Sequence, residues 1–326
     1  MKIFITGASG FIGNKLAWRL AEEGHEINAL VRNKAAAQEL QHPRIKVFAG
    51  DITSPQTVEP AIENCEQVYH IAGFAKLWAK NPAVFYDVNV WGTETILKLS
   101  LKYGVKKLVY TSSAAVFGPS LKNPIIENDP RVTAYKNNYD LSKYMAEALV
   151  RDYSQKGLFS VIVNPSRVYG PGLETHSNTI TRMVRRALAG KFVLMPGIRN
   201  VIGNYAFIDD VVSGHIQAMR SGLSGERYIL GGENVSYQDV INIVKQEIRN
   251  AKIIPLPIAA VKGWGYVELL KNRITGNDPL FTPEAVGRYL QNAALSCQKA
   301  KMQLGYHITG FREGLQQTIS YLQRSA

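Results

Sequence analysis

Three side chains in this sequence have the types and spacing needed to transfer a proton to a carbonyl oxygen. Tyr139 and Lys143 stand four residues apart, and Ser113 ends the upstream segment Thr111-Ser112-Ser113. Residues four apart share one face of a helix, so the lysine ammonium would lie beside the phenol. A neighbouring cation lowers the pKa of a phenol from about 10 towards neutrality, where the phenol can serve as a general acid or base.

The serine would complete this arrangement. Ser113 would hydrogen-bond the substrate oxygen as charge develops on it. Ser112 is the alternative, because neighbours on a strand point to opposite sides. A Tyr-x-x-x-Lys pair alone is a weak signal, since a tyrosine on a helix usually anchors packing. Together with an upstream serine and a glycine-rich turn at the start of the chain, the pair predicts a hydride-transfer site.

The glycine-rich turn lies between a strand predicted at 2–6 and a helix that opens at Phe11. It reads TGASGFIG over residues 6–13, with a G-x-x-G-x-x-G spacing that departs from the commoner G-x-G-x-x-G. Glycines let the backbone approach a pyrophosphate closely, and a helix N-terminus offers free N–H groups and a positive dipole end. We therefore expect a dinucleotide to be held by Gly7, Ser9, Gly10, Phe11, Ile12 and Gly13.

The residue after the second strand distinguishes the two nicotinamide cofactors. An NAD site needs a carboxylate there for the ribose hydroxyls, whereas an NADP site needs a cation for the 2′-phosphate. The sequence has Arg32 at this point and no acid nearby, so it favours NADP(H) over NAD(H). Two further pairs at strand ends are candidate cofactor contacts: Asp51-Ile52 for the adenine, and Ala72-Gly73 for close approach of the cofactor. His70 is interpreted as a hydrogen-bonded residue at a strand end rather than a catalyst.

The elements that must position these residues alternate along the first half of the chain. Short, nearly continuous apolar segments alternate with helical patterns, which predicts a parallel sheet with crossover helices. The predicted strands are 2–6, 26–31, 45–48, 67–71, 107–111 and 159–164, and the predicted helices are 11–23, 33–40, 83–103 and 135–156.

After Pro165 the alternation becomes irregular. Strands are predicted at 203–208 and 227–230, and helices at 209–221, 236–248, 258–271, 281–291, 296–304 and 312–323. The predicted fold class is α/β. A doubly wound parallel sheet would occupy residues 1–168, with 203–230 able to rejoin it, and a smaller mixed α/β substrate domain would occupy most of 169–326.

Composition predicts a globular cytoplasmic protein. The 326 residues are 46% hydrophobic and 20% charged. Cys65 and Cys297 lie far apart without a disulfide pattern, and the six histidines lack ligand spacing, so no metal is expected. The N-terminus begins directly on a strand rather than on a signal peptide, and no stretch reaches the roughly 18 apolar residues of a membrane span.

The formal charge of +12 has two interpretations. One is a polyanionic or membrane partner, and the other is a solvated basic surface around a site for a polyphosphate cofactor. Lysines and arginines are spread along the chain without a long run, which favours the second, and no nucleic-acid-binding module is present. The expected partner is a small-molecule substrate, and a homodimer stays open.

Taken together, these motifs resemble the extended short-chain dehydrogenase/reductase family over essentially the whole chain. The matching segments are 6–13, 51–52, 89–93, 111–118, 139–143, 164–171 and 207–211. The resemblance implies a Rossmann sheet with a smaller C-terminal substrate domain. It also implies roles for single residues: Tyr139 as general acid/base, Lys143 as its partner, Ser113 as the substrate-polarising hydroxyl, Asn89 as an auxiliary residue, and Pro165 and Val168 lining the nicotinamide.

The C-terminal part helps to choose a branch of that family. Nucleotide-sugar epimerases and dehydratases often carry an Arg-Pro-Gly-Asp-like element for the diphosphate, whereas residues 289–306 here read YLQNAALSCQKAKMQLGY. This is more similar to the dihydroflavonol reductase and 3β-hydroxysteroid dehydrogenase branch, or to hopanoid-associated relatives. The apolar segment 253–270 is either a lid over a hydrophobic substrate or a plain core helix.

Three functions therefore compete. The first is NADP(H)-dependent reduction of a ketone or aldehyde of a fairly apolar small molecule, or oxidation of the alcohol. The second is a nucleotide-sugar epimerase or dehydratase with tightly bound NAD. The third is a redox-sensing or scaffold protein that binds NADP(H) without chemistry, and the intact Tyr/Lys pair counts against it.

Overall fold

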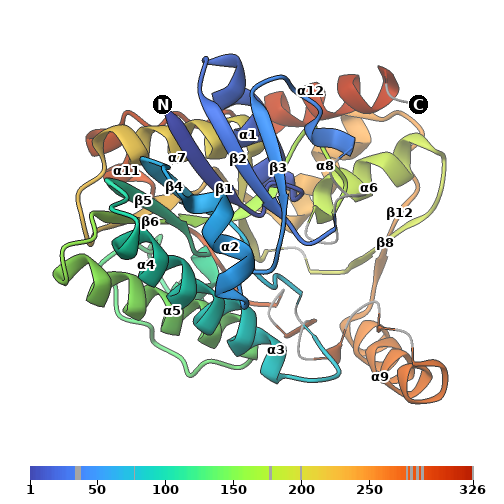
Figure 1. The fold of residues 1–326 in the computed structure, drawn as a ribbon. Coiled ribbons are helices and arrows are strands. Elements are labelled where there is room, and N and C mark those ends of the chain that lie inside the picture. Colours follow the sequence, from blue (N-terminus) through green and yellow to red (C-terminus); the bar gives the residue numbers. More distant parts are fainter. Residues whose placement is uncertain are drawn as a thin grey trace.

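A seven-stranded parallel sheet forms the centre of the protein, in the strand order β10-β6-β5-β4-β1-β2-β3 (Figure 1). The computed structural model describes residues 1–33, 38–76, 78–175, 178–198, 200–276, 278–279, 282–283, 286–287 and 290–324. The strands are β1 (Lys2–Thr6), β2 (Glu26–Val31), β3 (Ile45–Ala49), β4 (Gln67–His70), β5 (Lys107–Thr111), β6 (Ser160–Pro165) and β10 (Arg227–Leu230). The predicted doubly wound fold is confirmed, and the predicted strands of this sheet agree to within one residue at each end.

Both faces of the sheet are covered, which explains the continuous apolar segments of its strands. In β1, Ile3 and Ile5 point into one core and Phe4 points into the other. The first core is shared with α1 (Phe11–Glu22) and α7 (Ile208–Ser221). The second is shared with α2 (Pro55–Ile62), α4 (Gly92–Lys102) and α5 (Asn138–Gln155), and Figure 1 shows α4 and α5 side by side.

The stretch predicted as one helix over 83–103 changes its winding in the middle. It consists of α3 (Ala83–Tyr86), a π-helical segment (Asp87–Trp91) and α4. The π-helical segment carries Asn89, which is fully buried. A π-helical turn inside a longer helix is uncommon and frequently marks a functional site.

The rest of the chain forms two smaller sheets and their helices. One sheet has the order β11-β9-β7, and the other pairs β12 with β8. The strands are β7 (Arg167–Tyr169), β8 (Val193–Pro196), β9 (Ile202–Phe207), β11 (Glu233–Ser236) and β12 (Ile253–Leu256). The helices are α6 (Thr179–Leu188), α8 (Tyr237–Glu247), α9 (Ile258–Thr275), α11 (Gln298–Leu304) and α12 (Phe311–Arg324).

Several elements were not anticipated from the sequence: α2, α6 and the four-residue or shorter strands β7, β8, β11 and β12. Within the predicted helix 33–40, residues 34–37 lie outside the described residues and 38–40 form a single 3-10 turn. Of the predicted helix 281–291, residues 281, 284, 285, 288 and 289 lie outside the described residues, while 283, 286 and 287 are helical. Of the helices in the described part of the chain, none has both the length and the hydropathy for crossing a bilayer.

Candidate active site

The loops after β1 and β4 meet where the strand order of the sheet reverses. Thr6, the last residue of β1, pairs in register with His70, the last residue of β4. From β1 the chain builds the sheet towards β3, and from β4 it builds towards β6 and β10. In open α/β sheets the carboxyl ends of the strands at such a switch point form the ligand crevice.

Each of the three glycines in the turn after β1 occupies a position with a specific structural requirement. Gly7 has a φ of +73°, and a Cβ atom there would lie 2.6 Å from the Ala72 nitrogen. A Cβ on Gly13 would lie 2.2 Å from the Gly7 oxygen, so α1 can pack onto the turn only without one. Gly10 is the N-cap of α1 and its N–H donates to the Gly7 carbonyl at 2.9 Å.

The start of α1 fits a phosphate group. Among the described residues, no side chain caps its N-terminus, and its first turn contains no acidic residue. The N–H groups of this turn have no carbonyl partner within the helix, and the helix dipole is positive at this end. Phe11 is buried, and Ser9 and Ile12 are half-buried. The residues present therefore suit the pyrophosphate of a dinucleotide.

The other cofactor candidates lie along the same edge of the sheet. Arg32 directly follows β2 and is exposed. The Asp51 carboxylate accepts hydrogen bonds from the backbone and hydroxyl of Thr53 at 2.9 and 2.8 Å. Ile52 is buried below Gly92, where a Cβ atom would lie 2.8 Å from its side chain. The carboxylate of Asp51 thus stabilises its own turn.

Lys143 is the central charged group of the site. It lies on α5, one turn after Tyr139, and is buried. Its Nζ donates to the Thr111 carbonyl at 2.7 Å and lies 4.4 Å from the centre of the Tyr110 ring. Burial lowers the pKa of Lys143 to about 7, and the carboxylate of Glu147 acts in the opposite direction.

Asn89 and Gly73 lie next to this ammonium. A Cβ atom on Gly73 would lie 3.1 Å from Asn89 Oδ1 and 3.7 Å from Lys143 Nζ. Asn89 Oδ1 accepts from the Phe74 N–H at 2.7 Å, and its Nδ2 donates to the Ser142 hydroxyl at 2.9 Å. The loop after β4, the π-helical segment and α5 are therefore joined at one point.

A cavity of about 280 Å³ opens in front of Ser113. Ser113 and Pro165 line it, and so do Asn137 and Asp140, which flank the half-buried Tyr139 on α5. Val168 is half-buried and packs against the core instead. Ser112, the alternative hydroxyl, is buried, and its Oγ has no hydrogen-bond partner among the described residues. The rest of the described lining comes from Ala114, Ala115, Gly118, Pro119, Arg131, Thr133, Lys136, Ser166, Arg167, Asn204, Gly287, Gln291, Asn292, Ala293 and Leu295.

His70 links the end of β1 to the first turn of α4. Its ring bridges Thr6 Oγ1 at 2.7 Å and Thr93 Oγ1 at 3.0 Å. Thr93 donates its only hydroxyl proton to the Asn89 carbonyl, so the His70 Nε2–H must donate to Thr93 and Nδ1 must accept from Thr6. Burial lowers the pKa of His70 to about 3, which keeps the ring neutral. As predicted, His70 is a hydrogen-bonded histidine at a strand end.

A second buried histidine, His215 of α7, hydrogen-bonds to Thr111, whose carbonyl accepts from Lys143. Its Nδ1 donates to the Val211 carbonyl at 2.7 Å, so its Nε2 accepts from Thr111 Oγ1 at 2.9 Å. Burial lowers the pKa of His215 to about 4, so this ring is also neutral. Sequence analysis did not identify His215, because 104 residues separate it from Thr111.

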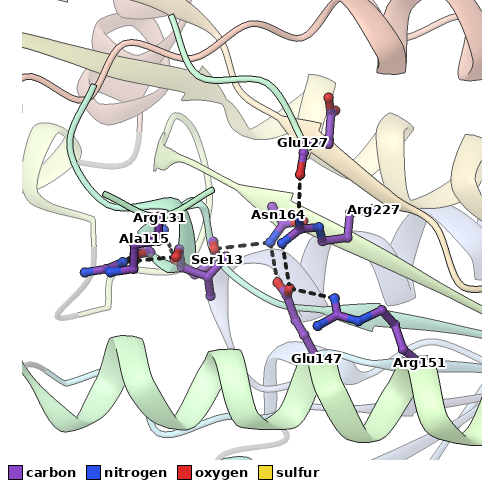
Figure 2. A network of polar contacts seen from close by, with 9 residues as sticks. Ser113, Ala115, Glu127, Arg131, Glu147, Arg151, Asn164 and Arg227 are labelled. Carbon is purple, nitrogen blue, oxygen red and sulfur yellow. Dashed lines mark hydrogen bonds and ion pairs between the residues drawn. The ribbon is translucent and has the colours of Figure 1, made fainter. Parts of the chain in front are cut away.

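Glu147 supports the Ser113 loop through Asn164 (Figure 2). It is fully buried one turn after Lys143, and its Oε1 accepts from Asn164 Nδ2 at 2.6 Å. The same Nδ2 donates to the Ser113 carbonyl at 3.2 Å. Arg151 and Arg227 lie 3.5 and 3.4 Å from Glu147 Oε2 and balance its charge.

On the other side of Ser113, the guanidinium of Arg131 holds the turn that follows. It donates to the carbonyls of Ala115 and Val116 at 2.8 and 3.0 Å (Figure 2). Sequence analysis did not identify Glu147, Asn164 or Arg131 as site residues. The spacing of Glu147, four residues after Lys143, is a signal that could have placed it on the same helix face.

Known proteins resemble this chain in sequence and in fold. Residues 3–231 match the NAD dependent epimerase/dehydratase family. A Synechocystis sp. protein provisionally named dihydroflavonol 4-reductase is 30% identical over 98% of this chain and 94% of its own length. The 3-beta-hydroxysteroid dehydrogenase of Mycolicibacterium neoaurum is 26% identical over 94% of this chain and 86% of its own. The structure of the Thermus thermophilus UDP-glucose 4-epimerase in complex with NAD covers 100% of both chains with a TM-score of 0.83 and 24% identity.

The fold and the site together define an oxidoreductase that uses a nicotinamide dinucleotide. The chain belongs to the NAD-dependent epimerase/dehydratase family, and its relatives include proteins named as reductases and sterol dehydrogenases. This confirms the resemblance inferred from the sequence motifs.

The lowered pKa of Lys143 predicts a pH-dependent contribution to stability. This pKa is about 7 in the folded protein and about 10.4 in an unfolded chain, so between these values the unfolded state binds more protons. In the cofactor-free protein, the free energy of unfolding should therefore rise with pH across this window, by up to roughly 1.4 kcal/mol per pH unit. Lys143→Met should lack that rise. Urea unfolding of both proteins at several pH values measures it, and a difference that stays constant with pH would contradict the assignment.

Glu147→Gln should affect both stability and the pH profile. Replacing the buried carboxylate by a neutral amide removes the charge partner of Arg151 and Arg227, and the free energy of unfolding should fall by roughly 2–3 kcal/mol. Glu147 raises the pKa of Lys143, so in the variant the ammonium should lose its proton at a lower pH. The alkaline limb of the kcat profile should therefore shift to lower pH. Urea unfolding and the alkaline limb of the kcat profile are the measurements. Glu94→Gln, which removes only a surface ion pair with Lys98, is the matched control and should change neither by much.

Proposed function

We propose that this protein is an NADP(H)-dependent oxidoreductase that reduces a ketone or aldehyde of a fairly apolar small molecule, or oxidises the corresponding alcohol. The observation that carries the proposal is the pair on α5, with a buried ammonium one helical turn after Tyr139 and beside the loop after β4. When bound, the dinucleotide supplies or accepts the hydride.

The chain's own residues would handle the proton and the developing charge. Tyr139 would give its phenolic proton to the carbonyl oxygen, and Lys143 would stabilise the phenolate that remains. The Ser113 hydroxyl would hydrogen-bond the same oxygen as it becomes negative. Ser113 is supported for this role by its place in the cavity wall, between Arg131 and the Asn164–Glu147 pair.

Two observations support the substrate class. The relatives named dihydroflavonol 4-reductase and 3-beta-hydroxysteroid dehydrogenase have names that specify hydroxyl or carbonyl chemistry on ring compounds. The cavity wall also offers an apolar part, formed by Ala114, Ala115, Pro119, Pro165 and Leu295. The lining also includes the cationic side chains of Arg167 and Lys136, so the substrate would carry an oxygen substituent as well.

Arg32 supports NADP(H) as the cofactor. It is exposed at the end of β2, next to the strand that leads into the glycine turn. A guanidinium suits a 2′-phosphate, which a carboxylate in this place would repel.

A nucleotide-sugar epimerase or dehydratase is the second candidate. It is favoured by the cations of the cavity wall, because Arg167 and Lys136 would suit the diphosphate of such a substrate. The two functions differ in redox balance. An epimerase would keep tightly bound NAD through purification and would consume no NADPH, whereas the reductase would consume one NADPH per carbonyl reduced.

Tyr139→Phe should lower kcat for carbonyl reduction by about 10²- to 10⁴-fold, because it removes the proton donor. The Kd for NADPH should change little. NADPH oxidation with a panel of carbonyl compounds of graded hydrophobicity measures the first, and fluorescence titration measures the second. Tyr144→Phe, an exposed tyrosine on the same helix, is the control and should keep normal turnover. Full activity of Tyr139→Phe would remove the proposed mechanism.

Arg32→Glu should reverse the cofactor preference. Loss of a charge-assisted contact and repulsion of the 2′-phosphate should lower kcat/KM for NADPH by about 10- to 150-fold, while NADH is affected much less. The ratio of kcat/KM for the two cofactors is the measurement. Arg44→Glu makes the same charge change at another exposed arginine and should leave the ratio unchanged. An unchanged ratio in Arg32→Glu would assign the cofactor preference to other residues.

A further inference from the structure

Helix α9 exposes its apolar side to solvent. Its buried residues are Val261, Gly265 and Glu268, so the side that faces the protein includes a carboxylate. Figure 1 shows α9 next to β8 and β12, set apart from the helices that cover the large sheet. Of its described residues, none lines the cavity at Ser113. The helix is therefore neither a plain core helix nor a wall of that cavity.

The exposed side carries a continuous apolar stripe. Gly263, Val267, Leu270 and Ile274 follow one another at intervals of four, three and four residues, which places them on one face. Val267, Leu270 and Ile274 are 59%, 57% and 78% exposed. An amphipathic helix of a globular protein normally turns such a stripe towards the core. Here the stripe points away from it.

Cations border this stripe on both sides. With 100° per residue, Lys262 and Arg273 lie along one edge and Lys271 along the other. All three are exposed, whereas the one acid of the helix, Glu268, is on the buried side. Tyr266, 66% exposed, lies between the stripe and the first edge. Basic residues beside an apolar stripe are the pattern of helices that lie in the surface of an anionic bilayer.

The strand pair that leads into α9 also carries exposed apolar side chains. Leu194 of β8 and Ile254 of β12 pair in register, so they share a face, and they are 44% and 39% exposed. Phe192, 56% exposed, precedes β8, and Lys252 Nζ lies 5.4 Å from the centre of its ring. Pro257 alone separates β12 from α9.

We propose that α9 and the β8–β12 pair form a docking surface for anionic phospholipid, with α9 lying in the plane of the bilayer surface. The apolar stripe would enter the interface, and Lys262, Lys271 and Arg273 would contact the headgroups. Of the 18 residues of α9, four are charged, which suits a helix that lies in the bilayer surface. A symmetric contact with a second copy would bring these cations against their own equivalents, in a chain with a formal charge of +12. The surface is separate from the Ser113 cavity and does not depend on the proposed function.

Cosedimentation of the full chain with vesicles tests this proposal. The protein should bind phosphatidylcholine vesicles that contain phosphatidylglycerol, bind pure phosphatidylcholine weakly, and dissociate partly at high salt. Leu270→Asp/Lys271→Glu should lower the apparent affinity at least about tenfold, because it removes one apolar contact and reverses one cation. The circular dichroism spectrum and the urea unfolding of this variant should equal those of the parent and show that it is folded.

The matched control is Leu121→Asp/Lys122→Glu, the same pair of changes at an exposed leucine and lysine elsewhere on the surface. It should keep the vesicle affinity of the parent. The proposal is overturned if the parent does not sediment with anionic vesicles, or if the two double variants lose affinity equally. A dimer that is abolished by the α9 variant, without any vesicle binding, would assign the surface to a second copy and also overturn it.

Discussion

The burial of one ammonium group determines how the rest of the site is built. Taking Lys143 out of water is costly, and its lowered pKa is the direct sign of that cost. Three partners offset part of it: the carbonyl of Thr111, the face of the Tyr110 ring, and the field of Glu147. A charge that is only partly compensated within the fold is well suited to stabilise negative charge on a neighbouring phenol.

The groups that fix this ammonium are uncharged or internally balanced. His70 and His215 are buried and neutral, and each joins a strand end to a helix through a hydroxyl on the strand. The carboxylate of Glu147 is balanced by two partly exposed arginines. His70 and His215 add no charge at the site, so the pKa of Lys143 is set by burial and by Glu147. Rigid neutral supports thus hold the reacting groups in place without disturbing their titration.

How much of this could be predicted from the sequence depends on how local each feature is. The parallel strands were predictable because burial on both faces leaves continuous apolar segments, and the glycine turn because its sterics are local. The π-helical segment at Asp87–Trp91 was not, since its side-chain pattern also fits an ordinary helix. His215 acts on Thr111 across 104 residues of sequence, which no local pattern encodes. For α9 the apolar composition of 253–270 was evident, but composition does not show which side of a helix meets the core and which meets solvent.

The carboxyl ends of β5 and β6 show why a fold of this kind places its site there. Ser112 Oγ, Asn164 Oδ1 and Ser166 Oγ are buried and, among the described residues, have no hydrogen-bond partner. Polar atoms left in this way reduce stability, and folded proteins contain few of them. These atoms lie at the carboxyl ends of β5 and β6, as Ser113 does. This edge of the sheet therefore leaves buried polar atoms without hydrogen-bond partners. Apart from these atoms and from Tyr110 Oη and Gln217 Oε1, the buried side-chain polar atoms of the described residues have hydrogen-bond partners, so the scaffold can tolerate that local loss of stability.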